Sequence, residues 1–424
     1  MMRPETLKIL LTIALYKEWD IRQWDVVAAY LQATLKHDIY VTDINEDGET
    51  EYWLLHKALY GLKQSGHEWY KLLSEILESA AYNRCIGDEG CFASKIDSGK
   101  DCKSIIGTHV DDMLGIGPSN MLDDIERGIG NSVELDKRGR PEKMLGMELT
   151  WNKEGTEVIL TQYGLIDSLA NTHRVSVTGA RSSLPVDAEC FKESRQNDPC
   201  DKKQFQQIIG SLLFIARRTR PDIAIHVNLL GRRASNLSTT HLQAAYRLLR
   251  FLELTRLDGI KLTKPRSLKV EIYADASYGG EESRSQSGAV MTLGGQVVGW
   301  STRRQDIVAL SITEAEYIAD CEGAKDAAWV NQFLQEMKTQ CEPTPILATD
   351  SEGAYNLSKT TKFLRRSRHI EHRFHYLRQQ VQRDRLKIRT IPGKENPADI
   401  LTKLLPMSII KNWKMQWMGS AGAK

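Results

Sequence analysis

The stretch from Ile105 to Gly117 reads IIGTHVDDMLGIG and places two adjacent carboxylates, Asp111 and Asp112, between two apolar runs. Each run is short, which is typical of a buried strand. An unpaired carboxylate is costly to bury, so the two aspartates require either an exposed turn or a bound cation. We therefore predict a β-hairpin that carries Asp111 and Asp112 in its turn, at the rim of a sheet.

The composition is that of a globular protein. The 424 residues suffice for two or three domains, and 41% are hydrophobic and 26% charged. There is no apolar run of about 18 residues, so no membrane span is expected, and the N-terminus lacks the pattern of a signal peptide. The seven cysteines include no Cys-X-X-Cys pair. This favours a reducing compartment and argues against a zinc site.

The net charge of +2 hides two basic stretches, residues 217–250 and 359–389, in which acidic residues are few. Aromatic residues accompany both stretches, at Tyr246, Phe374 and Tyr376. One interpretation is that they are solvated helix faces. The other is that they bind a polyanion such as nucleic acid.

The pattern of the chain changes twice. Strands and helices are mixed up to about residue 160, and apolar residues then recur at helical spacing from Tyr163 to Leu257. From Leu268 the pattern is mixed again, with a hairpin turn at Gly294 and Gly295 followed by a long helix. The order predicted for this last part is β-hairpin-α-β-α-β-α.

A second set of carboxylates lies in the last part. Asp275 and Asp350 end predicted strands. Ser311 and Glu314 fit a capping box, which gives Glu314 a structural role. Glu316 faces another side of the same helix, and we therefore favour Glu316 over Glu314 as a ligand.

Asp399 has two interpretations. Asn396 fits a helix N-cap with Pro397 in the first turn, and Asp399 would then be a favourable acid near the helix start. Alternatively, Asp399 completes a metal site. The order Asp, Glu, Asp, Asp along the predicted β and α pattern favours the metal site.

Carboxylates from separate strand ends can hold two divalent ions about 4 Å apart. Asp25, at the end of another predicted strand, joins Asp111 and Asp112 in a first such group. Mg²⁺ prefers oxygen ligands and substrate phosphates, so each group has ligands that can hold two Mg²⁺ or Mn²⁺ ions.

Four motifs resemble, in this order, the palm of a copia-type LTR-retrotransposon reverse transcriptase: WDVVAAYL (24–31), ALYGLKQSGHEWY (58–70), HVDDMLGIG (109–117) and MLGMEL (144–149). The resemblance implies that Asp25, Asp111 and Asp112 bind the metal ions. It also implies that Tyr30 stacks on the nucleotide sugar, and that Tyr60 and Gly61 line the nucleotide pocket.

Two features depart from that family. His109 stands where the family has a tyrosine. The fingers region that precedes the palm and holds the triphosphate is absent from these residues. We expect polymerisation to need fingers from another chain, as in a homodimer.

Further motifs resemble the ribonuclease H domain of the same elements: YADASYGG (273–280), LSITEAEYIA (310–319), TDSEGA (349–354), RRSRHIEHRFHYLR (365–378) and ENPADILTK (395–403). The resemblance implies that Asp275, Glu316, Asp350 and Asp399 are the four metal ligands. The loop 391–399 lacks the histidine that many ribonucleases H carry there. Arg365, Arg366 and His369 are expected to contact nucleic acid.

The helical part, notably GSLLFIARRTRPDIA (210–224), resembles the thumb and connection of that family, with Arg217, Arg218 and Arg220 as phosphate contacts. We therefore expect a multi-domain α/β protein. Its predicted segments are an α+β palm at 1–155, a helical thumb and connection at 156–266, a mixed-sheet ribonuclease H-like α/β domain at 267–406, and a loosely attached tail at 407–424.

The function expected from the resemblance is a retrotransposon reverse transcriptase and ribonuclease H. Its partners would be RNA–DNA hybrid, template-primer and deoxynucleotides, without a membrane, in the cytoplasmic retrotransposon particle and also in the nucleus. One alternative is a catalytically dead remnant that only binds nucleic acid. Another is an unrelated metal-binding α/β enzyme, whose carboxylates would follow a different order.

Overall fold

The computed structural model describes residues 1–95, 102–175, 200–279, 283–337, 339, 344–360 and 375–422. The chain forms two compact units. The first comprises residues 1–141 and 333–340, and the second comprises residues 142–332 and 341–424. Within the described residues, no helix is both long and apolar enough to cross a membrane.

The first unit is built on a six-stranded sheet with the order β4-β5-β6-β7-β1-β8, in which neighbouring strands are antiparallel. The strands are β1 (Asp20–Val26), β4 (Tyr82–Arg84), β5 (Cys91–Ser94), β6 (Ile105–His109), β7 (Asp112–Gly117) and β8 (Leu135–Gly139). His109 pairs with Asp112, so Val110 and Asp111 form the turn between β6 and β7. The predicted hairpin is therefore confirmed.

Four helices accompany this sheet: α1 (Pro4–Lys17), α2 (Ala29–Gln32), α3 (Ser65–Ser79) and α4 (Ser119–Gly130). In α4, Leu122, Ile125 and Ile129 recur at helical spacing, and all three are buried. They join Trp24 of β1 and Trp69 of α3 in the hydrophobic core. The indole N–H of Trp69 donates to the Val110 carbonyl oxygen at 2.7 Å, which fixes the carboxylate turn to this core.

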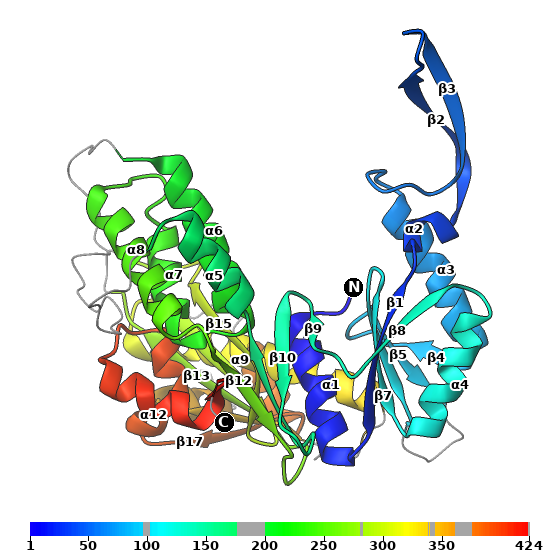
Figure 1. Cartoon of the computed structure of the whole chain (residues 1–424). Coiled ribbons are helices and arrows are strands. Elements are labelled where there is room, and N and C mark those ends of the chain that lie inside the picture. The colour runs from blue at the N-terminus through cyan, green and yellow to red at the C-terminus, as the bar shows by residue number, and fades with distance from the viewer. Residues whose placement is uncertain are drawn as a thin grey trace. The chain divides into compact units, whose positions relative to one another are not determined.

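A two-stranded ribbon, β2 (Thr34–Ile44) and β3 (Thr50–Lys57), extends from the first unit (Figure 1). The residues of both strands are exposed or partly exposed, and large hydrophobic side chains such as Tyr52 and Trp53 are among the exposed ones. A ribbon of this kind is stable only with further packing.

The second unit begins with a five-stranded sheet of order β18-β12-β11-β10-β9, and all its neighbouring strands are antiparallel. The strands are β9 (Lys143–Met144), β10 (Met147–Trp151), β11 (Glu157–Thr161), β12 (Asp258–Thr263) and β18 (Met418–Ser420). The motif at 144–149, which we assigned to the palm segment, therefore lies in the second unit.

Residues 407–424 differ from the expected loose tail. The described part of this segment, residues 407–422, includes α12 (Met407–Trp417) and β18, which pairs with β12. Ile410 and Trp417 are buried, and the Lys414 ammonium lies 2.8 Å from a carboxylate oxygen of Asp258. Burial of the apolar face of α12, together with strand pairing, holds this segment against the sheet.

Helices dominate the next part of the second unit, as predicted. They are α5 (Tyr163–Thr172), α6 (Lys202–Arg218), the short 3₁₀ helix η2 (Pro221–Ile223), α7 (Ala224–Gly231) and α8 (Thr239–Leu254). The Asp201 carboxylate caps α6 by accepting from the Gln204 N–H at 2.9 Å. Phe205, Ile208 and Leu212 bury one face of α6.

The last sheet has the order β15-β14-β13-β16-β17. Its strands are β13 (Val270–Ser277), β14 (Gln286–Leu293), β15 (Gln296–Arg304), β16 (Ile346–Thr349) and β17 (Lys387–Thr390). The first three strands are antiparallel, whereas β16 is parallel to β13 and to β17. Gly294 and Gly295 form the predicted turn, with φ angles of 59° and 81° that favour glycine.

Helix α9 (Ile312–Glu336) connects β15 to β16, α10 (Glu352–Lys359) follows β16, and α11 (Tyr376–Gln382) precedes β17. A side chain at Gly323 would approach Leu347 to 3.0 Å and Ile272 to 3.3 Å, so glycine lets α9 lie close against the sheet. The multi-domain α/β fold class is confirmed, and so is the predicted β-hairpin-α-β-α-β-α order, except that its last helix is a short 3₁₀ helix.

Candidate active sites

Three carboxylates from separate elements meet in the second unit. Asp275 is on β13, Glu316 is in the second turn of α9, and Asp350 directly follows β16. Each offers an oxygen atom, and these three atoms all lie within 4.8 Å of one another. The cause is the parallel pairing of β13 with β16, in which Tyr273 is opposite Ala348. Asp275 and Asp350 each lie two residues beyond this pair, so both are at the same end of the two parallel strands.

Burial controls the protonation of this centre. Asp275 is 1% exposed and Glu316 is 8% exposed. Burial raises the pKa of Asp275 to about 6, although Lys403 and Thr402 lower it. Burial, reinforced by the neighbouring Asp275, raises the pKa of Glu316 to about 9. The centre therefore holds acidic groups that favour either protons or a cation.

The fourth predicted ligand, Asp399, joins the centre through a lysine. The Lys403 ammonium lies 3.2 Å from Oδ1 of Asp275 and also binds Oδ1 of Asp399. The Thr402 hydroxyl donates to the other oxygen of Asp275, Oδ2. Although burial acts to lower it, the two aspartates raise the pKa of Lys403 above its usual value. Lys403 is therefore a cation at this centre.

Asn396 combines its predicted capping role with a second one. Its side-chain oxygen accepts from the Ala398 N–H at 3.1 Å and caps the 3₁₀ helix η6 (Pro397–Leu401), which follows η5 (Gly393–Glu395). Its amide nitrogen donates to the Ala274 carbonyl at 2.8 Å and to Oδ1 of Asp350 at 3.3 Å. Sequence reasoning found the cap but missed this contact with Asp350.

The two glutamates at the start of α9 divide as expected. The Glu314 N–H donates to the Ser311 hydroxyl at 3.1 Å, and the Glu314 carboxylate accepts from the Leu310 N–H at 2.7 Å. The structural role of Glu314 is confirmed. The Glu316 carboxylate instead accepts from the Ala276 N–H at 3.0 Å, beside Asp275.

A further carboxyl group, Asp320, lies one turn beyond Glu316 and is fully buried. Burial raises its pKa well above the usual value, and Asp350 and Asp275 add to this effect, while Thr349 opposes it. Sequence reasoning missed Asp320. Its spacing of four residues from Glu316 was the available signal, because such residues share a helix face.

These residues fit a divalent cation. Carboxylate oxygens are the ligands that Mg²⁺ and Mn²⁺ prefer. Like charges held this close in a buried site are stabilised by a bound cation. Asp275, Glu316 and Asp350 would hold one ion. Asp399 lies beside this group, because the Lys403 ammonium contacts both Asp275 and Asp399. Their roles as metal ligands stay predictions.

The predicted site of the first unit lies at a sheet rim. Asp25 is opposite Asp112 in the pairing of β1 with β7, and the Val26 N–H donates to the Asp111 carbonyl at 2.9 Å. An Arg138 guanidinium nitrogen lies 3.0 Å from Oδ2 of Asp25. Burial raises the pKa of Asp25, which Arg138 lowers and the two neighbouring aspartates raise. The three aspartates are therefore electrostatic neighbours.

This rim group is less compact than the buried centre. Among the residues that the structure describes, only Asp275, Glu316 and Asp350 bring three ligand atoms within 4.8 Å. Asp25, Asp111 and Asp112 are all partly exposed. The structure brings these three aspartates to one rim without closing them around a common point.

The predicted nucleotide-pocket residues lie beside this rim. The rings of Tyr30 and Tyr60 have centroids 4.6 Å apart. Burial raises the pKa of Tyr60, and Asp111, Tyr30 and Asp25 add to the increase, so the phenol is close to these groups. Gly61 has a φ of 99°, which explains glycine in this turn. Nucleotide binding by these residues stays a prediction.

One of the predicted phosphate contacts needs correction. Arg220 is fully buried, and its guanidinium donates to both carboxylate oxygens of Asp222 at 2.9 and 2.8 Å. It also donates to the Thr255 carbonyl at 3.0 Å. Arg220 is therefore a structural residue that cannot reach a nucleic acid.

The other predicted nucleic-acid contacts differ in their exposure to solvent. Arg217 is exposed, whereas Arg218 is half-buried, donates to the Leu145 carbonyl at 3.2 Å and stacks 3.5 Å from the centre of the Phe214 ring. Arg365, Arg366 and His369 lie outside the described residues.

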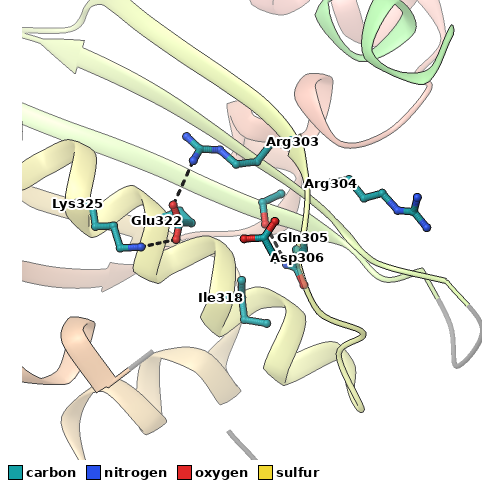
Figure 2. A pocket seen from close by; sticks show the side chains of 8 residues that line it. Arg303, Arg304, Gln305, Asp306, Ile318, Glu322 and Lys325 are labelled. Atoms are coloured by element: carbon teal, nitrogen blue, oxygen red, sulfur yellow. Dashed lines mark hydrogen bonds and ion pairs between the residues drawn. The ribbon is translucent and has the colours of Figure 1, made fainter. Parts of the chain in front are cut away.

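A shallow pocket of the second unit lies between the end of β15 and α9. Figure 2 shows its lining residues Ser287, Arg303, Arg304, Gln305, Asp306, Ile318, Glu322 and Lys325. The Glu322 carboxylate bridges two of the cations, at 2.6 Å from Lys325 and 3.2 Å from Arg303. Since Glu322 and Asp306 offset these cations, the pocket has mixed charge and is not a simple anion site.

Comparison with known proteins identifies the relatives of the chain. Residues 1–183 match a family described as reverse transcriptase (RNA-dependent DNA polymerase). The chain is 28% identical over 414 residues to the Retrovirus-related Pol polyprotein from transposon TNT 1-94 of Nicotiana tabacum, a match that covers 95% of this chain and 31% of that protein. It is 29% identical over 420 residues to the Retrovirus-related Pol polyprotein from transposon RE1 of Arabidopsis thaliana, covering 97% of this chain and 28% of that protein.

The chain thus spans about a third of the length of these relatives. Among solved structures, LC11-RNase H1 in complex with RNA/DNA hybrid is 18% identical with a TM-score of 0.26, covering 34% of this chain and 99% of that chain. The order and directions of β13 to β17 define the fold of this part independently of that structure.

Proposed function

We propose that this chain, whose resemblance to retrotransposon Pol polyproteins is confirmed over nearly its whole length, hydrolyses the RNA strand of RNA–DNA hybrids. The reaction takes place at Asp275, Glu316, Asp350 and Asp399, with Mg²⁺ or Mn²⁺. One observation carries the proposal: three carboxylate oxygens from three separate elements converge within 4.8 Å. The order of these carboxylates along the chain, Asp, Glu, Asp and Asp, is the one that the ribonuclease H resemblance implies.

The protein groups around the centre hold the carboxylates in place before substrate arrives. The Thr402 hydroxyl fixes Asp275, the Ala276 N–H fixes Glu316, and the Asn396 amide fixes Asp350. Bound divalent ions supply activation of water and neutralisation of charge on the leaving 3′-oxygen. Because the carboxylates are already oriented, little reorganisation is needed when ions and substrate bind.

Discrimination of the RNA strand is a consequence of the substrate itself. Only RNA offers a 2′-hydroxyl beside the scissile phosphate, and that group is both a donor and an acceptor. The exposed Arg217 contributes to backbone binding, because a guanidinium pairs well with phosphate. The protein is proposed to bind the hybrid mainly through its backbone.

The first unit supports a second activity, RNA-directed DNA polymerisation at Asp25, Asp111 and Asp112. The family match at residues 1–183 and the position of Tyr30 and Tyr60 beside the aspartates favour it. Its substrates are a template-primer and deoxynucleotides. The rim group is open, so we propose that polymerisation requires fingers supplied by another segment or by a second copy of the chain.

The test is a cleavage assay with a 5′-labelled RNA annealed to DNA. The purified chain is incubated with Mg²⁺ or with EDTA, beside Asp350→Asn and the matched control Asp384→Asn. Asp384 is exposed between α11 and β17, with a φ of 52° that asparagine tolerates. We expect cleavage that needs Mg²⁺, persists in the control and disappears in Asp350→Asn.

Two outcomes would contradict the proposal. Unchanged cleavage by Asp350→Asn would remove the carboxylates from the reaction. Absence of cleavage by a folded chain that still binds the hybrid would leave the alternative, a remnant that binds nucleic acid without turnover.

A further inference from the structure

Lys403 occupies a place at the carboxylate centre that the proposed function does not use. Its ammonium lies 3.2 Å from Oδ1 of Asp275 and also binds Asp399. The Asp275 side chain is 1% exposed, whereas that of Lys403 is 39% exposed. A positive charge therefore enters the buried centre from a side chain that is still open to solvent along part of its length.

The local chain conformation places this lysine. After Asp399 the backbone closes a turn, with the Thr402 and Lys403 N–H groups donating to the Asp399 carbonyl at 3.2 and 3.0 Å. This turn aims both side chains at Asp275, where Thr402 takes one oxygen and Lys403 the other. The segment that carries Asp399 thus also supplies hydrogen-bond donors to both oxygens of Asp275.

The centre consequently has two halves. In one half, Asp275, Glu316 and Asp350 bring three oxygens together. Within the described part of the chain, neither Glu316 nor Asp350 forms an ion pair with a lysine or arginine. In the other half, the ammonium of Lys403 bridges Asp275 and Asp399. Asp275 belongs to both halves. Among the described residues, the half with Glu316 and Asp350 has no cation between its carboxylates, whereas the half with Asp399 has the Lys403 ammonium.

We propose that Lys403 is a built-in counter-ion that occupies the second cation position of this centre in the substrate-free protein. The centre then binds one divalent ion at Asp275, Glu316 and Asp350. It admits a second ion at Asp275 and Asp399 only after the ammonium has moved away. This inference rests on the proposed function in one respect, namely that these carboxylates bind divalent cations.

The chemistry of lysine suits this role. Its ammonium is a compact charge on a flexible four-carbon stem, so it can leave without moving the backbone. A phosphate of the bound nucleic acid offers the ammonium another anionic partner at the moment when the second ion is needed. Loading of the second ion is thereby coupled to substrate binding, and the substrate-free protein avoids an unpaired buried carboxylate.

The experiment counts bound Mn²⁺ on the full chain without nucleic acid, using the electron paramagnetic resonance signal of free Mn²⁺. It is carried out in a background of Asp111→Asn and Asp112→Asn, which removes two of the three rim aspartates of the first unit. We expect one tightly bound Mn²⁺ when Lys403 is present. In Lys403→Met we expect a second ion, with an affinity higher by about tenfold or more.

Two control variants separate the charge from the side chain. Lys403→Arg keeps a positive charge and is expected to keep one tight site. Lys411→Met removes an exposed lysine of α12 and is expected to change nothing. If Lys403→Met binds Mn²⁺ with the same stoichiometry and affinities as the chain that keeps Lys403, the proposal is wrong. If no variant binds Mn²⁺ at all, the metal site of the proposed function is wrong instead.

Thermal melting gives a second readout. Without Lys403, Asp275 and Asp399 lose their shared cation, so metal-free Lys403→Met should melt at a lower temperature than the wild type. Mg²⁺ should raise its melting temperature more than that of the wild type, because the ion replaces the missing charge. A Lys403→Met or Lys403→Gln protein that is unfolded with and without Mg²⁺ would contradict the proposal.

Discussion

Two groups of carboxylates in this chain have similar chemistry and different surroundings. In the first unit, Asp25 and its neighbours stand on the rim of a sheet, and the side chain of Asp25 is 22% exposed. In the second unit, Asp275 is 1% exposed and Glu316 is 8% exposed. Burial raises the pKa of Glu316 to about 9, whereas at Asp25 the effect of burial, which raises the pKa, is opposed by Arg138.

The difference shows what prepares a carboxylate group for a cation. In the buried centre, hydrogen bonds and one ammonium orient the carboxylates, and the low dielectric makes their mutual repulsion strong. At the rim, solvent screens the charges, and no such compact group of ligand atoms forms among the described residues. We infer that the buried centre binds ions on its own, while the rim group needs a nucleotide to complete its ligand set.

The largest expected effect is the loss of primer extension at the rim aspartates while hybrid cleavage at the buried centre persists. Asp111→Asn should reduce primer extension by at least about a hundredfold, because the proposed function makes Asp111 a metal ligand in the transition state. Hybrid cleavage should stay within about twofold of the wild type, because Asp111 belongs to the other compact unit. Extension and cleavage are measured on the same preparation. Loss of both activities in Asp111→Asn would show that the two units do not function separately.

The second effect concerns stability and pH. Glu316 and Asp275 have pKa values raised to about 9 and about 6 in the folded protein. The unfolded chain loses these protons at lower pH, so the metal-free protein should lose stability as pH rises from about 5 to 9. Each kcal/mol lost lowers the melting temperature by about 2–4 °C. Glu316→Gln should remove most of this slope.

The comparison predicts a different result at the rim. Asp25→Asn should leave most of the pH slope in place, since Asp25 is partly exposed and paired with Arg138. Calorimetry in EDTA measures the dependence of the melting temperature on pH for both variants. In a separate series with saturating Mg²⁺, this dependence should be weaker for the wild type, because the ion replaces protons. A slope that survives in Glu316→Gln and vanishes in Asp25→Asn would reverse the ranking of the two groups.

Burial separates two arginines in the same way. Arg220→Met leaves the Asp222 carboxylate buried, and among the described residues its remaining ion-pair partner is Lys414, 3.4 Å away. Removing one member of a buried pair costs about 3–5 kcal/mol, and thermal melting should show it. Arg217→Ala should instead preserve stability and lower the salt dependence of hybrid binding by about one phosphate contact. Weaker nucleic-acid binding by a folded Arg220→Met would restore the original interpretation of Arg220.

Sequence predicted those features that depend on short-range pattern. Two apolar runs around Asp111 and Asp112 gave the hairpin, and a capping box separated Glu314 from Glu316. Long-range contacts escaped it. Arg220 is one of three neighbouring arginines, and it is buried in a place where Thr255, 35 residues away, accepts one of its hydrogen bonds.

The same limit explains two other results. Lys403 reads as a surface lysine until β13, 128 residues earlier, brings Asp275 to it. Residues 407–424 read as a tail because the partner of β18, the strand β12, is far away in sequence. Neither contact has a local signature, since each depends on which elements the fold brings together.

The smallest expected effect tests the comparison most directly. Arg138 pairs with Asp25 at the rim as Lys403 pairs with Asp275 in the buried centre, but the Asp25 side chain is 22% exposed whereas that of Asp275 is 1% exposed. An exposed ion pair is worth roughly 0–1 kcal/mol. Arg138→Gln, in an Asp275→Asn background, should therefore strengthen Mn²⁺ binding at the rim by no more than about threefold. Added salt should abolish this small gain, because it screens exposed charges. A gain as large as that of Lys403→Met would mean that the nearby cation, rather than burial, decides how each group responds to a divalent ion.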